Sequence, residues 1–284
     1  MKNSSESPEN QNNKNLPSAE EQYPDIFKCL DEIINQTLKL VHGNPIPDDR
    51  SYWGNVRMGL IFRAFNQYRS IVNLLRTNHW EDALILTRSL FELLLYTEEL
   101  LRKPDSEKAG ERFYLFSGLQ SYLEFRELTL YKVLTGRLGQ EVEDTIKNKW
   151  DKKAKETFSI FWYKNKKGRG KWRESWCNKN RAELSRASKN PMRIHQYHLI
   201  YGRGSDFTHS SPIAVFSASH FMPLGYELED LIGRSNSVEE QELKMVAPLA
   251  SIFFLEIFLL VGDRLPDFDH NWIGKTLETL KKMV

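Results

Sequence analysis

The sequence is poor in cysteine and lacks the short motifs of the common enzyme classes. Its two cysteines, Cys29 and Cys177, lie far apart and form no CxxC pair, so neither a zinc site nor a disulfide framework is indicated. No P-loop, GxGxxG, HExxH or GxSxG sequence occurs. His195 and His198 have ligand spacing on a helix, but no carboxylate at helical spacing joins them. We therefore expect a cytoplasmic protein with no metal site and no cofactor.

Alternating runs of the β-strand type are almost absent, whereas apolar residues recur at spacings of three and four along most of the chain. With 284 residues, of which 40% are hydrophobic, the chain is long enough to bury a substantial core. We expect an all-α fold over residues 23–284, a single helical-bundle domain built from antiparallel helical hairpins. Residues 1–22 are rich in Ser, Asn, Glu and Pro and lack the apolar core of a secretion signal, so we expect a disordered tail there.

Turn residues divide the expected domain into helices. Asn78 and Glu81 have the spacing of a capping box and predict the start of the third long helix, which would form an antiparallel hairpin with the second. A loop is expected at KNKKGRGKWRESW, and shorter helical pieces on either side of Ser188. The longer expected helices are Tyr23–His42, Trp53–Arg76, Trp80–Arg102, Glu107–Leu134, Gln140–Tyr163, Val238–Arg264 and Trp272–Met283.

One long hydrophobic run, Val246–Gly262, raises the question of a membrane. It is shorter than the roughly 20 residues needed to span a bilayer, and Glu256 interrupts it. We expect a central core helix that ends before Pro266, and no stable membrane insertion. Membrane association is a third and weaker interpretation of the whole chain.

Basic residues are concentrated in one stretch, Lys147–Arg193. This stretch has sixteen Lys and Arg and four acidic residues, a net charge of +12, whereas the whole chain carries +2, so the remainder carries −10. Such an uneven distribution favours a polyanionic partner such as RNA.

Aromatic residues alternate with basic ones in the centre of this stretch. Cations bind phosphates and aromatic rings stack on unpaired bases, so the composition suits a single-stranded nucleic acid. The alternative is a solvated charged segment whose tryptophans are core anchors. The candidate nucleic-acid-binding residues are Lys164, Lys166, Lys167, Arg169, Lys171, Trp172 and Arg173.

Two groups of polar residues recur at helical spacing. Tyr197, Tyr201, Ser205 and His209 are four residues apart and would share one face of a helix. Arg88 and Glu92 lie one turn apart among apolar neighbours, and must be paired or hydrogen-bonded if they are buried. They either line a polar pocket that His209 completes or form an ordinary ion pair within the helix.

Three segments, ALILTRSLFELLLY, KWRESW and YHLIYGRGSDFTHSSP, occur in this order between Trp53 and Pro212. Together they resemble a family of bacterial proteins catalogued only as a domain of unknown function. The resemblance implies an all-helical domain and no established activity. It also implies a shared polar site at Arg88, Glu92, Tyr201, Ser205 and His209.

Arg203 followed six residues later by His209 is similar to the R-x(4–6)-H signature of HEPN-type helical ribonucleases. In that family the His is a general acid or base on the ribose 2′-hydroxyl, and the Arg stabilises the phosphorane without a metal, usually across a dimer interface. On a regular helix these two side chains would point about 120° apart. A helix break at Gly202 or Gly204, or a second subunit, would let them converge.

These observations predict an RNA-directed protein, with two alternatives for its activity. The first is a metal-independent HEPN-like endoribonuclease of stress or phage defence, with a homodimer as its assembly. In it His209 is the acid or base and Arg203 or Arg88 the phosphate stabiliser. The second is a noncatalytic helical module whose basic face binds nucleic acid or an acidic partner protein. Ser205 and Tyr201 would complete the site in the first case and hold His209 in the second.

Overall fold

The computed structural model describes residues 18–42, 51–201, 228–263, 265 and 267–282. Long helices dominate it, and the described residues contain one two-stranded sheet. The expected all-α fold is therefore confirmed. Arg203, Ser205 and His209 lie outside the described residues.

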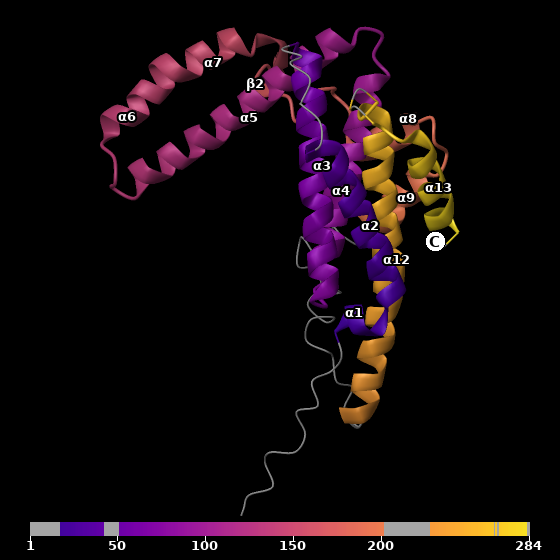
Figure 1. Ribbon diagram of the computed structural model, residues 1–284. Coiled ribbons are helices and arrows are strands. Elements are labelled where there is room, and N and C mark those ends of the chain that lie inside the picture. The colour runs from indigo at the N-terminus through magenta and orange to yellow at the C-terminus, as the bar shows by residue number, and fades with distance from the viewer. Residues whose placement is uncertain (1–17, 43–50, 202–227, 264, 266, 283–284) are drawn as a thin grey trace, which may run out of the picture.

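Four helices, α2 (Pro24–His42), α3 (Tyr52–Arg76), α4 (Trp80–Leu101) and α12 (Leu228–Val261), run side by side along the length of the molecule (Figure 1). Helix α12 is the most apolar of them, and Phe253, Phe254 and Phe258 are at most 1% exposed. The ring of Phe254 stacks on Tyr68 of α3 at 4.7 Å. The Tyr68 hydroxyl and the Ser251 hydroxyl are 2.9 Å apart, so this buried polar pair is satisfied.

The hydrophobic run of α12 is the centre of the bundle. By length and composition Glu240–Val261 could cross a membrane, but 72% of its most apolar window is buried inside the protein. Burial on this scale is what the core-helix interpretation of Val246–Gly262 predicts. The helix starts ten residues before the expected Val238 and continues through Pro248.

The capping box predicted at Asn78 and Glu81 is wrong. Asn78 has a φ of 60°, the left-handed conformation that commonly follows the end of a helix, and here it follows α3. The N-cap of α4 is instead His79, whose side chain makes no capping hydrogen bond and lies 2.9 Å from the Thr77 hydroxyl. Asn78 therefore ends one helix rather than starting the next.

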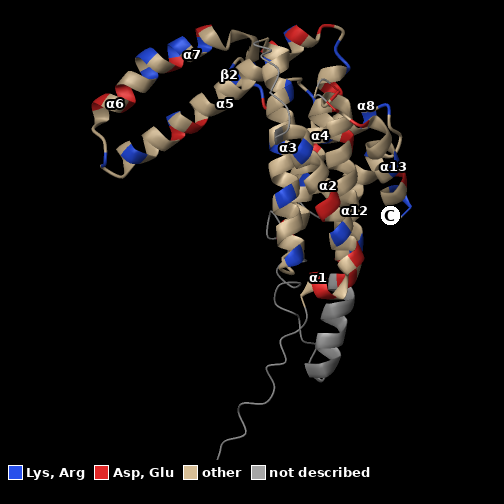
Figure 2. Ribbon diagram, in the orientation of Figure 1, with Lys and Arg blue, Asp and Glu red and all other residues tan. Residues whose placement is uncertain are grey.

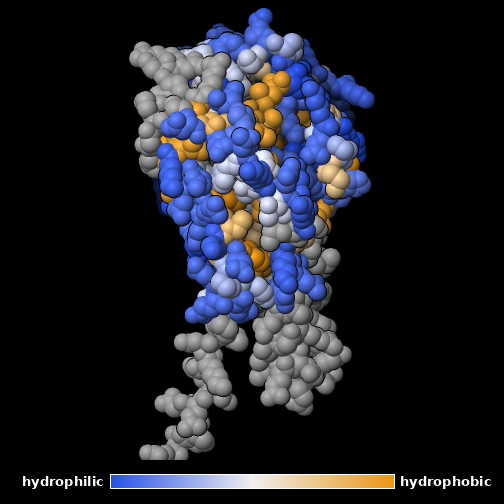
Figure 3. Space-filling view, turned by 45° about the vertical axis from the view of Figure 1, so that its right-hand side comes forward, coloured by the Kyte–Doolittle hydropathy of each residue, from blue (hydrophilic) through white to orange (hydrophobic). Residues whose placement is uncertain are grey.

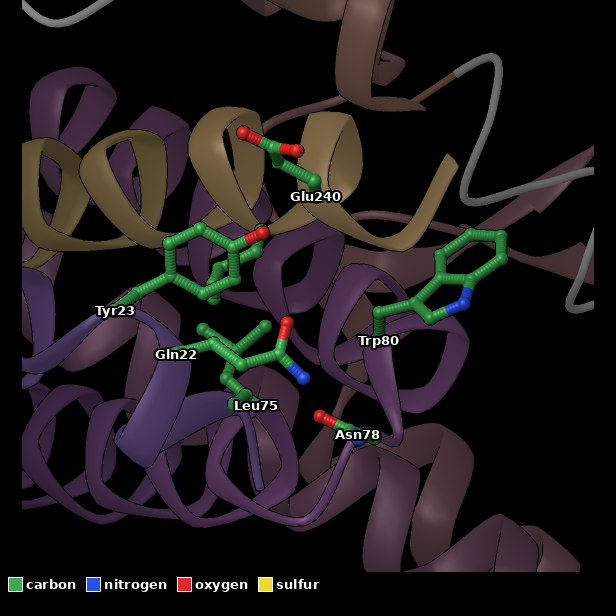
Figure 4. A pocket seen from close by; sticks show the side chains of 8 residues that line it. Gln22, Tyr23, Leu75, Asn78, Trp80 and Glu240 are labelled. Carbon is green, nitrogen blue, oxygen red and sulfur yellow. The ribbon is translucent and has the colours of Figure 1, made fainter. Parts of the chain in front are cut away.

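The end of the expected tail is helical. Helix α1 (Ala19–Gln22) has a complete capping box between Ser18 and Glu21, and Ala19 is buried. Figure 4 shows Gln22 and Tyr23 facing Asn78 and Trp80 across a small pocket, with Glu240 of α12 above. At about 20 Å³ this pocket has room for roughly one water, so it is no site for a substrate.

An arm extends away from the bundle (Figure 1). Its outward half is α5 (Ser106–Leu134). The chain then returns through three consecutive helices, α6 (Gln140–Thr145), the π-helix η1 (Ile146–Trp150) and α7 (Asp151–Thr157). The two sides are joined by Asp151, which accepts hydrogen bonds from the Tyr122 hydroxyl at 2.6 Å and from Arg126 Nε at 3.0 Å. The helix expected over Gln140–Tyr163 therefore ends earlier, at Thr157.

After α7 the chain returns to the bundle through a short 3-10 turn, η2 (Ser159–Phe161), and an antiparallel hairpin of β1 (Trp162–Lys164) and β2 (Gly170–Trp172). The hairpin replaces the loop expected there. Helices α8 (Arg181–Ala187) and α9 (Arg193–Gln196) and the π-helix η3 (Tyr197–Tyr201) follow, and α8 and η3 pack on α4. Helix α13 (His270–Lys281) packs on α12.

Candidate nucleic-acid interface

The hairpin is held in shape by its own turn. Asn165 Oδ1 accepts hydrogen bonds from the backbone N–H groups of Lys167 and Arg169, each at 3.0 Å. The backbone N–H of Asn165 donates to the Arg169 carbonyl at 2.8 Å. Gly168 has a φ of +72°, which a residue with a side chain rarely adopts. The basic residues around Gly168 are therefore presented on an ordered turn.

Five cationic side chains on this hairpin are exposed to solvent. One of them, Lys171, is paired with Glu174. The segment 162–174 holds six cations and one acid, so its net charge is six minus one, or +5. Figure 2 shows further Lys and Arg residues along α7, close to β2 in that view. The five exposed cations, called the hairpin cations below, are Lys164, Lys166, Lys167, Arg169 and Lys171.

The tryptophans of the basic stretch have two different roles. Trp176 is 2% exposed and packs edge-on against Phe113, so it is a core anchor. Trp162 and Trp172 are half-buried and face each other across the hairpin, with their ring centres 4.6 Å apart. Lys155 Nζ lies 4.8 Å from the centre of the Trp162 ring. The core-anchor alternative therefore holds for Trp176, whereas Trp162 and Trp172 keep part of their surface accessible.

A polar pocket of about 320 Å³ lies behind the hairpin. Tyr163 and Arg173 come from the hairpin side, and the Arg173 guanidinium lies 5.4 Å from the centre of the Tyr163 ring. Asn178 and Asn180 come from the segment that leads into α8, and Arg181 is the first residue of α8. An aromatic face, amide groups and cations therefore line one cavity, together with the carboxylates of Glu174 and Glu183. The ring, the amides and the cations are groups that can hold a nucleobase and its phosphate.

Arg88 and Glu92 belong to a cluster of three elements. Their Nε and Oε1 atoms are 3.5 Å apart on α4, and Glu92 Oε2 is also 3.1 Å from Arg181 Nε of α8. The Arg88 guanidinium lies 4.1 Å from the centre of the Tyr201 ring in η3, and this ring stacks on Tyr197 at 4.8 Å. The pair is thus more than an intrahelical ion pair, because it fixes α8 and η3 on α4.

The charges in this cluster are set by burial and by neighbours. Burial opposes the charged form of Arg181, but its pKa is raised overall, with the charge of Glu92 and the hydrogen bond to it among the causes, so Arg181 stays a cation. Burial raises the pKa of Tyr96, which stays a neutral phenol. Arg181 also lines the polar pocket, so the cluster and the pocket share one cationic side chain.

The predicted face of Tyr197, Tyr201, Ser205 and His209 is described only in its first half. Tyr197 and Tyr201 do lie on one side, but within a π-helix rather than an α-helix. Such wide turns are rare and frequently occur at functional sites. Of the predicted site residues on this face, the structure describes Tyr201, whose ring lies against the Arg88 guanidinium. Ser205 and His209 follow Tyr201 in the sequence.

Sequence reasoning missed Arg181 and Tyr96, and it included Tyr163 only as one of the aromatic residues that alternate with basic ones. Their partners on other elements cannot be read from sequence spacing, although Arg181 and Tyr163 stand within the basic stretch. Among the described residues, no group of three or more His, Cys, Asp or Glu side chains comes together in a way that could hold a metal ion.

Comparison with known proteins gives one match. A family model described as "Family of unknown function (DUF5677)" matches residues 55–222, a range that runs from α3 past η3 and contains Arg88, Glu92, the hairpin and Tyr201. Searches of curated proteins and of solved structures each returned no match. Because the matched range is more than half of the 284 residues, the chain belongs to this family of unknown function.

Proposed function

We propose that this protein binds single-stranded RNA through the hairpin cations and the pocket behind them. The observation that carries the proposal is the set of five exposed cations on an ordered hairpin, beside the half-buried rings of Trp162 and Trp172. Phosphates supply most of the affinity of such interfaces, and accessible rings stack on unpaired bases. A duplex keeps its bases stacked inside and could not use the rings in this way.

The polar pocket gives the strand a path inward from the hairpin. A base that stacks on Tyr163 could hydrogen-bond to the amides of Asn178 and Asn180, while Arg173 and Arg181 meet the adjoining phosphates. Arg181 then connects this path to the Arg88 cluster through Glu92.

A second candidate function is metal-independent RNA cleavage. It is favoured by the contact of Tyr201 with Arg88, because Arg203 comes two residues after Tyr201 and His209 eight residues after it in the sequence. In this scheme His209 is a general acid or base on the ribose 2′-hydroxyl, and Arg203 or Arg88 stabilises the charge on the phosphorane. Glu92 would hold Arg88 in place, and a homodimer in stress or phage defence is the proposed setting.

One experiment tests both functions. Wild type and His209→Ala, matched in folding by circular dichroism, are incubated in EDTA with a labelled single-stranded RNA, and binding and cleavage are scored together. We expect both proteins to bind, because the hairpin is unchanged. Cleavage by wild type alone, reduced at least 100-fold in the variant, is expected of a catalytic His209. Binding without cleavage would leave the noncatalytic module, and absence of binding would contradict the proposed function.

A further inference from the structure

A second pocket lies on a different part of the molecule, between α4, the end of α8 and α12. Its volume is about 350 Å³, within the range of about 300–1,000 Å³ typical of small-molecule sites. Its apolar wall is formed by Leu95 and Leu184, which are buried, and by Leu259 and Leu260 of α12. Figure 3, which turns the right-hand side of Figure 1 forward, shows hydrophobic residues interrupting the hydrophilic surface of that side.

An almost fully buried arginine forms the polar part of this pocket. The Arg193 side chain is 3% exposed and lies between two carboxylates, with Nη2 2.7 Å from both Glu98 Oε1 and Glu256 Oε2. Its Nε donates to Glu98 Oε1 at 2.8 Å, and Nη1 donates to Gln196 Oε1 at 2.7 Å. The three charged groups come from α4, α9 and α12, so the floor of the pocket is assembled by the tertiary fold.

The two carboxylates of this floor have different partners. Arg193 pairs with both, and Glu256 has a second cation in Lys281, whose Nζ is 3.8 Å from Glu256 Oε1 on a side chain that is 55% exposed. Glu98 Oε2 is buried and has no hydrogen-bond partner among the described residues. A buried acceptor of this kind is costly, and a bound donor would remove the cost.

The other charged residues of the pocket are already in use. Glu99 is surrounded by Arg102, Lys103 and Lys179. Arg102 also donates to the carbonyl of Ala187 at 3.1 Å. The remaining cation of the lining, Lys189, is exposed at the rim. The Glu98 side therefore offers the free acceptor, Oε2.

We propose that this pocket binds a small organic amine. Its ammonium group occupies the Glu98 and Glu256 side, and its apolar body lies against Leu259 and Leu260. The separation of an apolar wall from an acidic floor selects an amphipathic cation over a neutral or anionic molecule of the same shape. This site shares no lining residue with the polar pocket behind the hairpin, so it stands whether or not the protein binds RNA.

The test compares three probes of equal length, n-hexylamine, 1-hexanol and hexanoate, by calorimetric titration and by the shift in Tm at millimolar concentration. We expect n-hexylamine to bind and to raise Tm, because a ligand of the folded state stabilises it, and the other two to have little effect. Glu98→Gln should weaken amine binding about ten-fold or more, the effect of losing a hydrogen bond to a charged group.

Leu260→Trp fills the mouth of the pocket and should abolish amine binding, whereas Leu134→Trp on the exposed end of α5 should leave it unchanged. Binding of n-hexylamine that survives Leu260→Trp would place it elsewhere and overturn the proposal. Equal binding of hexanoate, or no binding of the amine by folded wild type, would overturn it as well.

Discussion

Replacing four hairpin cations by glutamine is expected to weaken the binding of single-stranded RNA by about 10²–10³-fold near 0.1 M salt. Each phosphate that a cation neutralises on a single strand contributes about 0.7 to the slope of log K against log salt. Four contacts together therefore contribute about 2.8 to this slope. At 0.1 M salt they strengthen the binding constant by a factor of about several hundred relative to its value at 1 M salt. The substituted residues are Lys164, Lys166, Lys167 and Arg169.

The measurement is fluorescence anisotropy of a labelled oligonucleotide over a range of salt concentrations. The slope should fall by about 3 in the variant, because the lost contacts are electrostatic. A control with the same change in net charge replaces Lys132, Arg137, Lys275 and Lys282, which lie on the arm and on α13 or just after it. Equal losses in the two variants would show a general charge effect and would contradict a site at the hairpin.

Arg193→Leu is expected to lower the free energy of unfolding by about 3–5 kcal/mol, the usual cost of removing one partner from a buried ion pair. The reason is burial, because the Arg193 side chain is 3% exposed and its removal leaves Glu98 without its cation and Glu256 with only the half-exposed Lys281. Glutamine at both acidic positions removes these carboxylate charges, so the triple variant should regain part of the loss.

Urea denaturation followed by circular dichroism measures this change. Arg186→Leu, at an exposed position of the neighbouring helix α8, is the control and should change stability by no more than about 0.5 kcal/mol. A loss below about 1 kcal/mol in Arg193→Leu would mean that the arginine does not hold α4, α9 and α12 together.

The long helices could be predicted because their apolar spacing is unambiguous. Helix α12 was placed in the core from its hydrophobic run, and Phe254 and Phe258 lie where that interpretation puts them. The hairpin was missed because each of its strands has three residues, too few to show an alternating pattern of apolar and polar side chains. Asn78 was misassigned because the same residue type favours both an N-cap and the left-handed position after a helix.

The candidate site was predictable only where its contacts are local. Arg88 and Glu92 could be paired from their spacing on one helix, whereas Arg181 comes 89 residues after Glu92 and is brought to it by the packing of α8 on α4. The division of the tryptophans also depends on tertiary structure, because neighbouring sequence does not distinguish the buried Trp176 from the half-buried Trp172.

The central claim, that the hairpin is the RNA-binding surface, is tested most directly by photocrosslinking. A single-stranded RNA containing 4-thiouridine is crosslinked to the full chain, the protein is digested at glutamate, and the attached peptides are identified by mass spectrometry. We predict crosslinks within residues 162–173, at Trp162, Tyr163 or Trp172. Crosslinks confined to other parts of the chain, under conditions in which the RNA is bound, would contradict the claim.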